Sequence, residues 1–345
     1  MRILHMIAGA EHGGAETYCL DAIKALDERG VEQHVICRPH SNYLETFSEK
    51  SISHSIRSFN KLLKWFEQNQ IKKDIENFEP DIVHCWMNRA SSFVPELNST
   101  PIIGWFGGYY KLKYYKNCDY YIGVTKDIVR HIGQETGTPE KAYVVHTFGT
   151  LEDSSPVRKS EFDIPDESPV VLLLSRMHWK KGIDTLLQAA GKLDGVYFLL
   201  AGDGPDIEKY KNMAVQMNVE ERVRFLGWRN DRAALLKIAD VCVLPSRYEP
   251  FGTVIAEAWH ASVPLVATKA DGARQYVTHE KDGLLCEIDD FEGLAENINK
   301  ALTNKNLKES LINSGQEKYK SLFSKEKVIE NLLYTYKKIH QKTKR

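Results

Sequence analysis

Short apolar runs recur along the chain, and polar stretches with helical periodicity separate them. In the first half these runs predict strands at Arg2–Ala8, Gln33–Cys37, Asp81–Cys85, Ile102–Trp105 and Tyr120–Val124. The stretches between them predict helices at Ala15–Glu28, Lys61–Glu76 and Asp127–Gln134. Strands that alternate with helices in this way are typical of βαβ units on a parallel sheet.

The same alternation restarts after a segment of different character, residues 151–169. Five residues there interrupt any period and predict a linker: Ser154, Ser155, Pro156, Pro165 and Pro169. Beyond it, strands are predicted at Val170–Leu174, Tyr197–Ala201, Arg224–Leu226, Val241–Leu244 and Pro264–Ala267, and helices at Ile183–Leu193 and Thr253–His260. We therefore expect an α/β protein with Rossmann-like domains at 1–150 and 170–324. An amphipathic helix within 325–345 should pack across the domain junction.

Composition narrows the class of protein without defining it. A length of 345 residues suits two domains, and a net charge of -1 argues against nucleic acid as a partner. The six cysteines show no Cys-x-x-Cys spacing, which favours a reducing compartment. No signal peptide is visible, and the apolar runs fall far below the roughly 20 residues needed to span a bilayer. We expect a cytoplasmic protein.

The most specific chemistry lies in the segment from Glu249 to Glu257, which joins a buried strand to an Ala-rich helix through a Pro-Phe-Gly turn. A helix N-terminus presents unpaired N–H groups and the positive end of the helix dipole, so it favours an anion such as phosphate. The two carboxylates suit sugar hydroxyls instead. This layout predicts a nucleoside-diphosphate sugar as the ligand. The alternative is that Glu249 caps the helix and Glu257 is an exposed helix residue.

Two further motifs follow strands of the second half. Arg176 and Lys181 come directly after Val170–Leu174, where they could grip a diphosphate and neutralise charge on a departing phosphate. The alternative is two surface cations, and we expect Lys180 to be solvated. Gly202 and Gly204 allow a close approach of backbone to ligand, but Ile207 stands where a dinucleotide-binding fingerprint requires a third glycine.

The first predicted strand is followed by Gly13, Gly14, Ala15 and Glu16, a glycine-containing turn that opens a helix. Such a turn is either an anion-binding nest of N–H groups or simply a tight connection. The chain contains no Asp-x-Asp sequence, the pair that commonly holds a divalent ion on a diphosphate. Fixed cations and helix N-termini would have to replace the metal, so we expect no metal and no other cofactor.

Together and in this order, these motifs resemble glycosyltransferase family 4 over nearly the whole chain, most strongly from about 170 to 290. The resemblance implies the GT-B architecture, two facing Rossmann-like domains with a cleft, and metal-independent transfer with retention of configuration. It implies catalytic roles for Arg176 and Lys181 at the donor diphosphate and for Glu249 at the donor sugar. The donor-binding positions it implies are Gly14, Gly202, Gly204, Gly227, Trp228, Gly252, Thr253, Val254 and Glu257.

One departure from the family concerns the first half. Many members carry a histidine after the strand equivalent to Ile102–Trp105, and here a glycine stands at that place. Backbone groups of Gly107 and Gly108, next to Tyr109, could serve on the acceptor side instead. His84 is a second candidate replacement, and a purely structural histidine is the alternative reading for it.

The expected partners are a UDP-sugar or GDP-sugar donor and a glycan or glycolipid acceptor, as in the synthesis of lipopolysaccharide or another surface glycan. Lysines and aromatics alternate in Tyr109–Lys116 and in Lys61–Phe66, which raises peripheral contact with the inner face of the plasma membrane. For the second stretch the alternative is that Leu62, Trp65 and Phe66 pack inward. The competing functions are a non-catalytic nucleotide-sugar-binding protein and an epimerase of similar fold.

Overall fold

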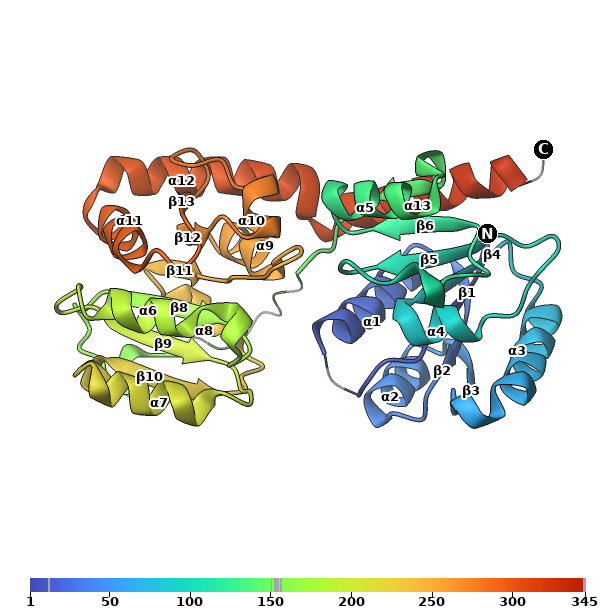
Figure 1. Ribbon diagram of the computed structural model, residues 1–345, viewed down its shortest axis with the longest axis horizontal. Coiled ribbons are helices and arrows are strands. Elements are labelled where there is room, and N and C mark those ends of the chain that lie inside the picture. Colours follow the sequence, from blue (N-terminus) through green and yellow to red (C-terminus); the bar gives the residue numbers. More distant parts are fainter. Residues whose placement is uncertain (12, 150, 152–154, 156, 344–345) are drawn as a thin grey trace. The chain divides into compact units, whose positions relative to one another are not determined.

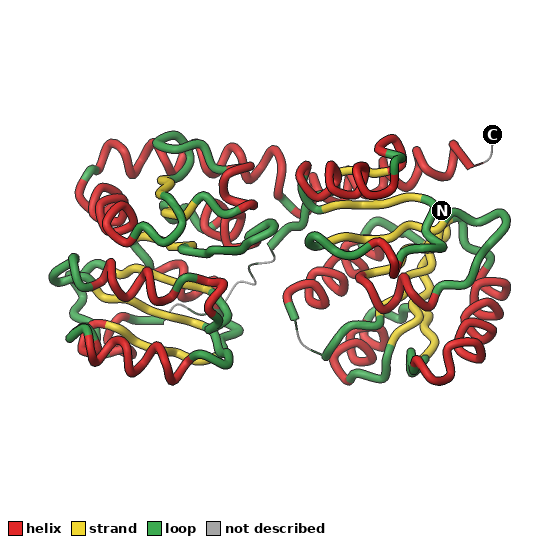
Figure 2. The backbone as a smooth tube through the Cα atoms, in the orientation of Figure 1, coloured by secondary structure: helices red, strands yellow, loops and turns green. Residues whose placement is uncertain are grey.

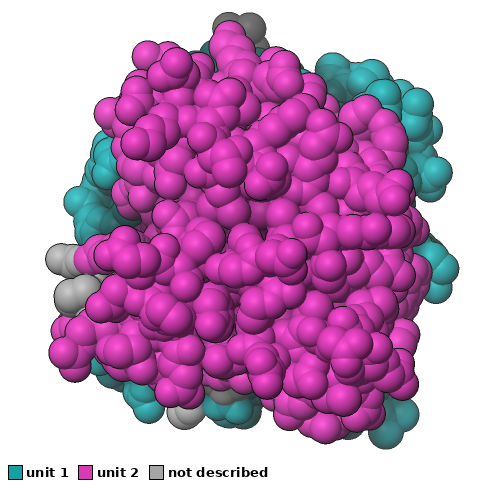
Figure 3. Space-filling view, turned by 90° about the vertical axis from the view of Figure 1, so that its left-hand side faces the viewer, with its two compact units in different colours: residues 1–148, 325–345 teal, residues 149–324 magenta. Residues whose placement is uncertain are grey.

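The computed structural model describes residues 1–11, 13–149, 151, 155 and 157–343. The chain divides into two compact units, coloured separately in Figure 3. Unit 1 comprises Met1–Phe148 and Lys325–Arg345, and unit 2 comprises Gly149–Ser324.

The described part of unit 1 is built on a seven-stranded sheet in the order β3-β2-β1-β4-β5-β6-β7, with every neighbouring pair parallel (Figure 1). Its strands are β1 (Arg2–Ile7), β2 (Glu32–Cys37), β3 (Ser53–Ile56), β4 (Ile82–Trp86), β5 (Ile102–Phe106), β6 (Tyr120–Gly123) and β7 (Ala142–Val144). Its α-helices are α1 (Gly14–Asp27), α2 (Ser41–Glu49), α3 (Lys64–Phe78), α4 (Met87–Phe93), α5 (Lys126–Thr136) and α13 (Lys325–Thr343).

Unit 2 repeats this plan with a six-stranded parallel sheet in the order β10-β9-β8-β11-β12-β13. Its strands are β8 (Val170–Leu174), β9 (Tyr197–Ala201), β10 (Val223–Gly227), β11 (Val241–Leu244), β12 (Leu265–Thr268) and β13 (Leu284–Cys286). Its α-helices are α6 (Ile183–Ala190), α7 (Ile207–Gln216), α8 (Arg232–Ile238), α9 (Thr253–His260), α10 (Asp271–Tyr276), α11 (Phe291–Thr303) and α12 (Lys305–Lys318).

Short helical turns connect these elements. They are η1 (Lys61–Leu63), η2 (Leu112–Tyr114), η3 (Pro139–Lys141), η4 (Lys159–Phe162), η5 (Trp179–Lys181), η6 (Glu220–Arg222) and the π-helical η7 (Tyr319–Phe323). In each unit helices flank the strands (Figure 2). A strand in the middle of such a sheet is covered on both faces, so it must be apolar throughout. All five residues of β8 are accordingly buried.

The predicted alternation of elements is confirmed. Strands β8, β9 and β11 and helix α9 have the predicted bounds. Three short strands were missed, namely β3, β7 and β13. The first is polar in sequence and at the sheet edge, and β7 is only half-buried. Edge strands need no continuous apolar run, so hydrophobic patterning does not reveal β3 and β7. Strand β13 is apolar but only three residues long.

The predicted linker covers residues 152–154 and 156, which lie outside the described residues. Residues 157–324 are part of unit 2, and Lys159 donates hydrogen bonds to the carbonyls of Asp166 (2.9 Å) and Ser168 (2.8 Å). The prolines of the later part of this segment therefore lie in structured backbone rather than in a free connection.

Helix α13 belongs to unit 1, although it is the last element of the chain. It buries one stripe at helical spacing, and the Lys325 ammonium lies 2.6 Å from the Glu28 carboxylate at the end of α1. The amphipathic helix is thus confirmed, while its packing across the domain junction remains a prediction. Within the described ranges, no helix combines the length and the apolarity that a membrane crossing requires.

Candidate functional site

The carboxyl ends of β8 and β11 form the point where the strand order of unit 2 changes direction. Ligands of open parallel sheets bind at such a point, because the connections on its two sides run to opposite faces and leave a crevice. The loops 175–182 and 245–252 start here and contain Arg176, Lys181 and Glu249. The carbonyl of Lys180 joins the two loops by accepting hydrogen bonds from the amides of Arg247 (2.8 Å) and Tyr248 (3.1 Å).

Close backbone approaches lock the loops around this point. A Cβ atom on Gly202 would lie 1.9 Å from the carbonyl oxygen of Ser175, and one on Gly182 would lie 2.0 Å from that of Pro245. Both glycines also have positive φ values, 145° and 63°. Any other residue would force the loops apart. The glycine-containing turn after β9 therefore has a structural explanation in addition to the predicted one.

Lys181 and Glu249 form an ion pair that lies 68 positions apart in sequence, with 2.5 Å between Nζ and Oε2. Both side chains are half-buried, and the Ser246 hydroxyl lies 3.4 Å from the same carboxylate oxygen. The N-cap residue of α9 is Gly252, and the hydrogen bonds of the Glu249 carboxylate join it to Lys181 and Ser246 rather than to an amide of α9. The capping alternative for Glu249 is therefore wrong.

The N-terminus of α9 opens next to this ion pair. Thr253 and Val254 are its first two residues, and both are half-buried. Their N–H groups lie outside the i→i−4 ladder of the helix, so they can donate to an anion. Arg176 is exposed at the end of β8, and among the described residues its guanidinium has no side-chain partner. A cation and two amides are thus available for a ligand.

Glu257 lies one turn further along α9, and its side chain is 1% exposed. Its Oε1 accepts a charge-assisted hydrogen bond from Arg232 Nη1 at 2.5 Å, while its Oε2 has no partner among the described residues. Burial raises the pKa of Glu257, and the Arg232 charge opposes that shift. The reading of Glu257 as an exposed helix residue is therefore wrong. A buried carboxylate oxygen without a donor favours a ligand that supplies one.

An ion-pair network that sequence reasoning missed supports the two loops. Arg247 binds both oxygens of Asp184 (2.9 and 2.8 Å), and its Nε lies 2.6 Å from Asp289. Burial alone would raise the pKa of Asp184, but the hydrogen bonds and charge of Arg247, together with the backbone amides of Asp184 and Thr185, lower that pKa overall. In the sequence, Arg247 and Asp184 stand near the motif residues. That proximity does not reveal that the two side chains pair with each other.

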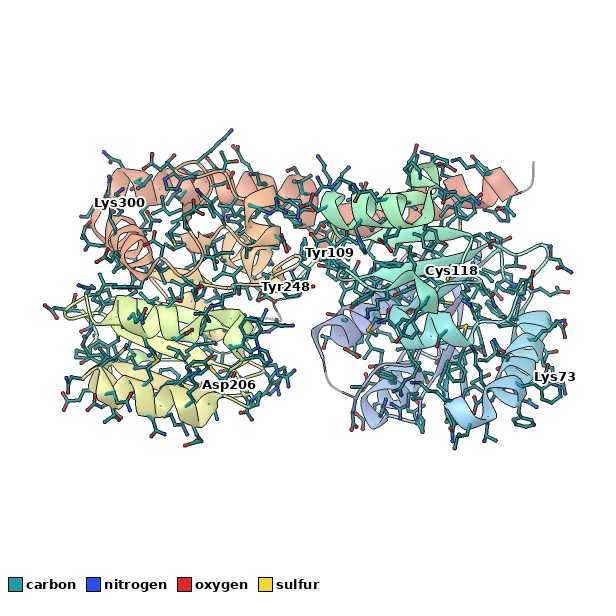
Figure 4. All side chains as sticks on the ribbon, in the orientation of Figure 1. Lys73, Tyr109, Cys118, Asp206, Tyr248 and Lys300 are labelled. Carbon is teal, nitrogen blue, oxygen red and sulfur yellow. The ribbon has the colours of Figure 1, made fainter. Side chains whose placement is uncertain are left out.

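The loop after β10 carries the remaining predicted residues of unit 2. The Gly227 carbonyl accepts a hydrogen bond from the Gly202 amide at 2.7 Å, which ties this loop to the turn that contains Gly204. Trp228 is largely exposed, and its indole N–H donates to the Asn230 side chain at 2.9 Å. An exposed ring fixed by a hydrogen bond is a suitable surface for stacking a base. Figure 4 labels Asp206, the N-cap residue of α7, and Tyr248, in the loop between β11 and α9.

In unit 1, Gly14 is exposed at the start of α1. A carboxylate oxygen of Glu16 accepts a hydrogen bond from the Ala10 amide at 3.0 Å and so holds the preceding turn against the helix. A Cβ atom on Gly14 would have no atom within 4 Å, so open space adjoins the first turn of α1. This arrangement leaves both predicted roles of the turn in place.

His84 does not lie at the surface. It is fully buried in β4, stacked on Trp86 at 4.2 Å, and its Nδ1 is hydrogen-bonded to the Tyr336 hydroxyl of α13 at 2.6 Å. Burial lowers its pKa well below the usual value, and the neighbouring His5 adds to the effect. The structure therefore corrects the placement of His84 at an acceptor site and supports the structural reading.

The glycines after β5 lie against an aromatic ring. A Cβ atom on Gly107 would lie 2.3 Å from Cη2 of Trp105, so the indole occupies the space that a histidine would need. The Gly108 carbonyl accepts a hydrogen bond from the Tyr110 amide at 2.9 Å. Tyr109, labelled in Figure 4, packs edge-on against His131 with 5.5 Å between ring centroids. These residues stay candidates for the acceptor side.

Comparisons with known proteins agree with this geometry. The family description "Glycosyl transferases group 1" matches residues 155–318, and "Glycosyltransferase Family 4" matches residues 12–149. The lipopolysaccharide core biosynthesis glycosyltransferase LpsD of Rhizobium meliloti is 30% identical over 339 residues, which cover 96% of this chain and 97% of LpsD.

Solved structures show the same fold. A glycosyltransferase from Rickettsia africae superposes with a TM-score of 0.87 at 20% identity, covering 98% of each chain. HepE of Anabaena, solved in complex with UDP, superposes with a TM-score of 0.84 at 20% identity, covering 98% of this chain and all of HepE's.

Two parallel-sheet units of this topology, which superpose on these solved structures, have the GT-B fold. The chain belongs to glycosyltransferase family 4. Among the residues described, no group of three or more His, Cys, Asp or Glu side chains could hold a metal ion. Transfer without a metal remains a prediction from sequence.

Proposed function

We propose that the protein transfers a sugar, with retention of configuration and without a metal, from a nucleoside-diphosphate sugar to a hydroxyl group of a glycan or glycolipid. The observation that carries this proposal is the Lys181–Glu249 pair beside the free N-terminus of α9, at the strand-order change of unit 2. A phosphate requires positive charge and N–H donors, whereas sugar hydroxyls require acceptors such as a carboxylate. The loops after β8 and β11 supply both kinds of group.

In the proposed complex the diphosphate lies against Arg176, Lys181 and the first amides of α9. Glu249 accepts hydrogen bonds from hydroxyls of the donor sugar. Glu257 does the same for the ribose, which offers a donor to the carboxylate oxygen that now lacks one. The exposed ring of Trp228 stacks on the base.

The reaction breaks the bond between the anomeric carbon and the diphosphate oxygen, and negative charge accumulates on that oxygen. Arg176, Lys181 and the helix amides stabilise this charge. Electrostatic stabilisation of this kind is usually the largest single contribution to lowering the barrier of such a step. The acceptor hydroxyl attacks from the face that the diphosphate leaves. Its proton passes to the departing phosphate, so no protein base has to be supplied.

The relatives support the choice of substrates. LpsD is named for lipopolysaccharide core biosynthesis, and HepE was solved with UDP. We therefore propose a UDP-sugar as the first donor to test, GDP-sugars as the second, and a lipopolysaccharide core intermediate at the cytoplasmic side as the acceptor. A non-catalytic nucleotide-sugar-binding protein remains the rival, because it would use the same pocket chemistry.

The test is a thermal-shift screen of the intact protein against UDP-sugars, GDP-sugars and the free nucleotides. A ligand that binds only the folded state stabilises it by RT ln(1 + [L]/Kd), about 2.7 kcal/mol at one hundred times Kd. We expect one donor to raise the melting temperature and Glu257→Gln to reduce that rise. No response to any nucleotide or nucleotide sugar would overturn the proposed ligand class.

Donor hydrolysis separates enzyme from binder. The selected donor is incubated with protein alone, and release of free sugar is followed by chromatography. Slow hydrolysis that is lost in Lys181→Ala supports an enzyme, since water then replaces the acceptor. Tight binding without hydrolysis, and without transfer to a lipopolysaccharide core acceptor, would favour the non-catalytic binder.

A further inference from the structure

The start of α3 in unit 1 exposes a run of large apolar side chains. All six residues from Lys61 to Phe66 are exposed, with Leu62 92% and Trp65 78% accessible and Leu63 and Phe66 more than half so. The reading in which Leu62, Trp65 and Phe66 pack inward is therefore wrong. We call the residues Leu62, Leu63, Trp65 and Phe66 the apolar turn.

Helix geometry explains why this turn faces outward. The face of α3 that packs on the unit consists of Glu67, Ile71 and Ile75, at positions i, i+4 and i+8. Trp65 and Phe66 lie six and five positions before Ile71, so at 100° per residue they emerge about 120° and about 140° away from the buried face, while Leu62 belongs to the preceding turn η1. The Asn60 side chain accepts a hydrogen bond from the Leu62 amide at 3.0 Å and holds the turn in this orientation.

The contacts made by the buried face of α3 prevent the helix from rotating so that the apolar turn faces inward. The Glu67 carboxylate is buried and accepts a hydrogen bond from the Ser58 hydroxyl. Rotating α3 to bury Trp65 would expose Ile71 and Ile75 and break this contact. The exposure of the apolar turn is therefore a property of the packed helix rather than a frayed end.

The charges around the apolar turn are basic. Four lysines, Lys61, Lys64, Lys72 and Lys73, lie on η1 and α3, and the acids of the same stretch are the buried Glu67 and, beyond Lys73, Asp74 and Glu76. Lys72 pairs weakly with Glu76 at 4.0 Å, while Lys73, labelled in Figure 4, has no ion-pair partner among the described residues. Lys61 and Lys64, which flank the leucines of the apolar turn, also form no ion pair among the described residues. Large apolar side chains next to such lysines complement a surface with an apolar layer under an anionic one.

We propose that the apolar turn docks unit 1 onto an anionic lipid bilayer. Trp65, Phe66 and the two leucines enter the boundary between headgroups and acyl chains, where tryptophan is favoured, and the lysines contact lipid phosphates. A bilayer fits better than a protein partner, because four side chains on a single turn are few beside the 20 to 30 residues that each side of a stable protein interface uses. The inference is independent of the donor site in unit 2.

The first test measures cosedimentation of the intact protein with vesicles of phosphatidylcholine and phosphatidylglycerol. Trp65→Ser/Phe66→Ser should lower the partition coefficient by at least tenfold, because two large side chains no longer leave water. The matched control is Tyr334→Ser, which removes an aromatic side chain that is 66% exposed on α13 of the same unit. That variant should bind vesicles like the wild type.

The second test concerns the charges. Lys61→Gln/Lys73→Gln should weaken binding to the same vesicles by about fivefold for each lysine, and the loss should shrink at high salt. Lys305→Gln/Lys320→Gln removes two exposed charges from unit 2 and is the control. Vesicles of pure phosphatidylcholine should bind the wild type much more weakly than the anionic ones.

Quenching by brominated lipids distinguishes insertion from adsorption. The protein has six tryptophans, so the quenched fraction of the fluorescence should disappear specifically in Trp65→Phe. Equal donor hydrolysis by wild type and Trp65→Ser/Phe66→Ser shows that the variant is folded and keeps this test separate from the proposed function. Unchanged vesicle binding by that variant overturns the proposal. So does a change confined to self-association in sedimentation velocity, which would identify the turn as a protein interface.

Discussion

The two sheets have the same topology but hold their ionisable groups in opposite ways. In unit 2, charges collect where the strand order changes, as the half-buried pair Lys181–Glu249 of two loops and the half-buried pair between Arg247 and Asp184 in the first turn of α6. In unit 1, the central strands β1 and β4 are mostly aliphatic, and their buried ionisable side chains include His5 and His84, which lie beside Trp86. Burial lowers the pKa of His5 to about 3 and that of His84 well below its usual value.

This difference shows that, in one fold, loops beyond the strand ends can carry ionised side chains, whereas positions within the central strands cannot. A loop beyond the end of a strand can keep a charge hydrated enough to stay ionised and still orient it, as unit 2 does. A side chain within a central strand must be neutral, because a charge there has neither water nor a counterion. Unit 1 accordingly uses its histidines as packing and hydrogen-bonding groups. Four predictions test this contrast, from the largest expected effect to the smallest.

The largest effect should follow from removing the charges of the loops in unit 2. Lys181→Ala and Glu249→Ala should each lower the turnover of the donor by about 100- to 1000-fold, the loss typical of removing one group that stabilises developing charge. Transfer rates with the donor selected above provide the measurement. Lys180→Ala is the matched control, since this neighbour is exposed, and should change the rate less than about twofold. Full activity in both loop variants, with normal melting, would remove these residues from the mechanism.

Glu257 tests whether the buried carboxylate binds ligand. Glu257→Gln keeps the shape but weakens the charge-assisted bonds, so donor affinity should fall by about 10- to 100-fold. Isothermal titration with UDP, or with the donor found in the thermal screen, measures this change. Glu208→Gln, which alters an exposed carboxylate paired with Lys211, should bind as the wild type does. An unaltered dissociation constant in Glu257→Gln would assign this carboxylate to the Arg232 contact alone.

His84 tests the neutral interior of unit 1 through pH. The folded state holds the pKa of His84 below its ordinary 6.5, so as pH falls below 6.5 the unfolded chain takes up a proton that the folded chain refuses. The free energy of unfolding therefore decreases toward acid, by about 1.4 kcal/mol per pH unit for this group. His84→Asn should lose that part of the slope, measured by hydrogen exchange in β4 between pH 7 and 5.

His279 is exposed, so His279→Asn is the control that shows how removing a solvent-accessible imidazole changes the pH dependence of the free energy of unfolding. His5 remains in both proteins, and since its pKa is also lowered, some acid sensitivity of unit 1 should persist in His84→Asn. If His84→Asn keeps the full slope of the wild type, His84 is not held neutral and the contrast between the units fails at this position.

The smallest effect concerns the support of the loops in unit 2. Asp184→Asn should lower the free energy of unfolding of unit 2 by about 1 kcal/mol at pH 7, since it weakens a half-buried ion pair. The folded state holds the pKa of Asp184 below its ordinary 3.8, so this contribution is present above that value and is lost as pH falls through the folded pKa. Wild type and variant should therefore converge in acid. Melting curves at pH 7 and in acid, with Asp194→Asn as an exposed control, would show a constant difference if the pair contributes nothing.

Much of the fold could be predicted from the sequence because central strands and their helices carry strong local patterns. The bounds of β8, β9, β11 and α9 follow from apolar runs, and the motif loops follow those strands directly. The edge strand β3 was not predicted, because three of its four residues are exposed and Ser53–Ile56 therefore has no apolar run. For the site, residue types and order were predictable, whereas the partners of Glu257 and Asp184 were not.

The sequence by itself determined the alternation of strands and helices, the restart of that alternation after residue 169, and the set of charged and glycine residues at the strand ends. Steric and periodic rules between near neighbours are sufficient for these features. Only the tertiary structure decided that Lys181 meets Glu249 across 68 positions, that Arg232 covers Glu257 across 25, that His84 is buried, and that the apolar turn faces water. These outcomes depend on which loops and faces come together when whole elements pack, and no local pattern encodes that choice.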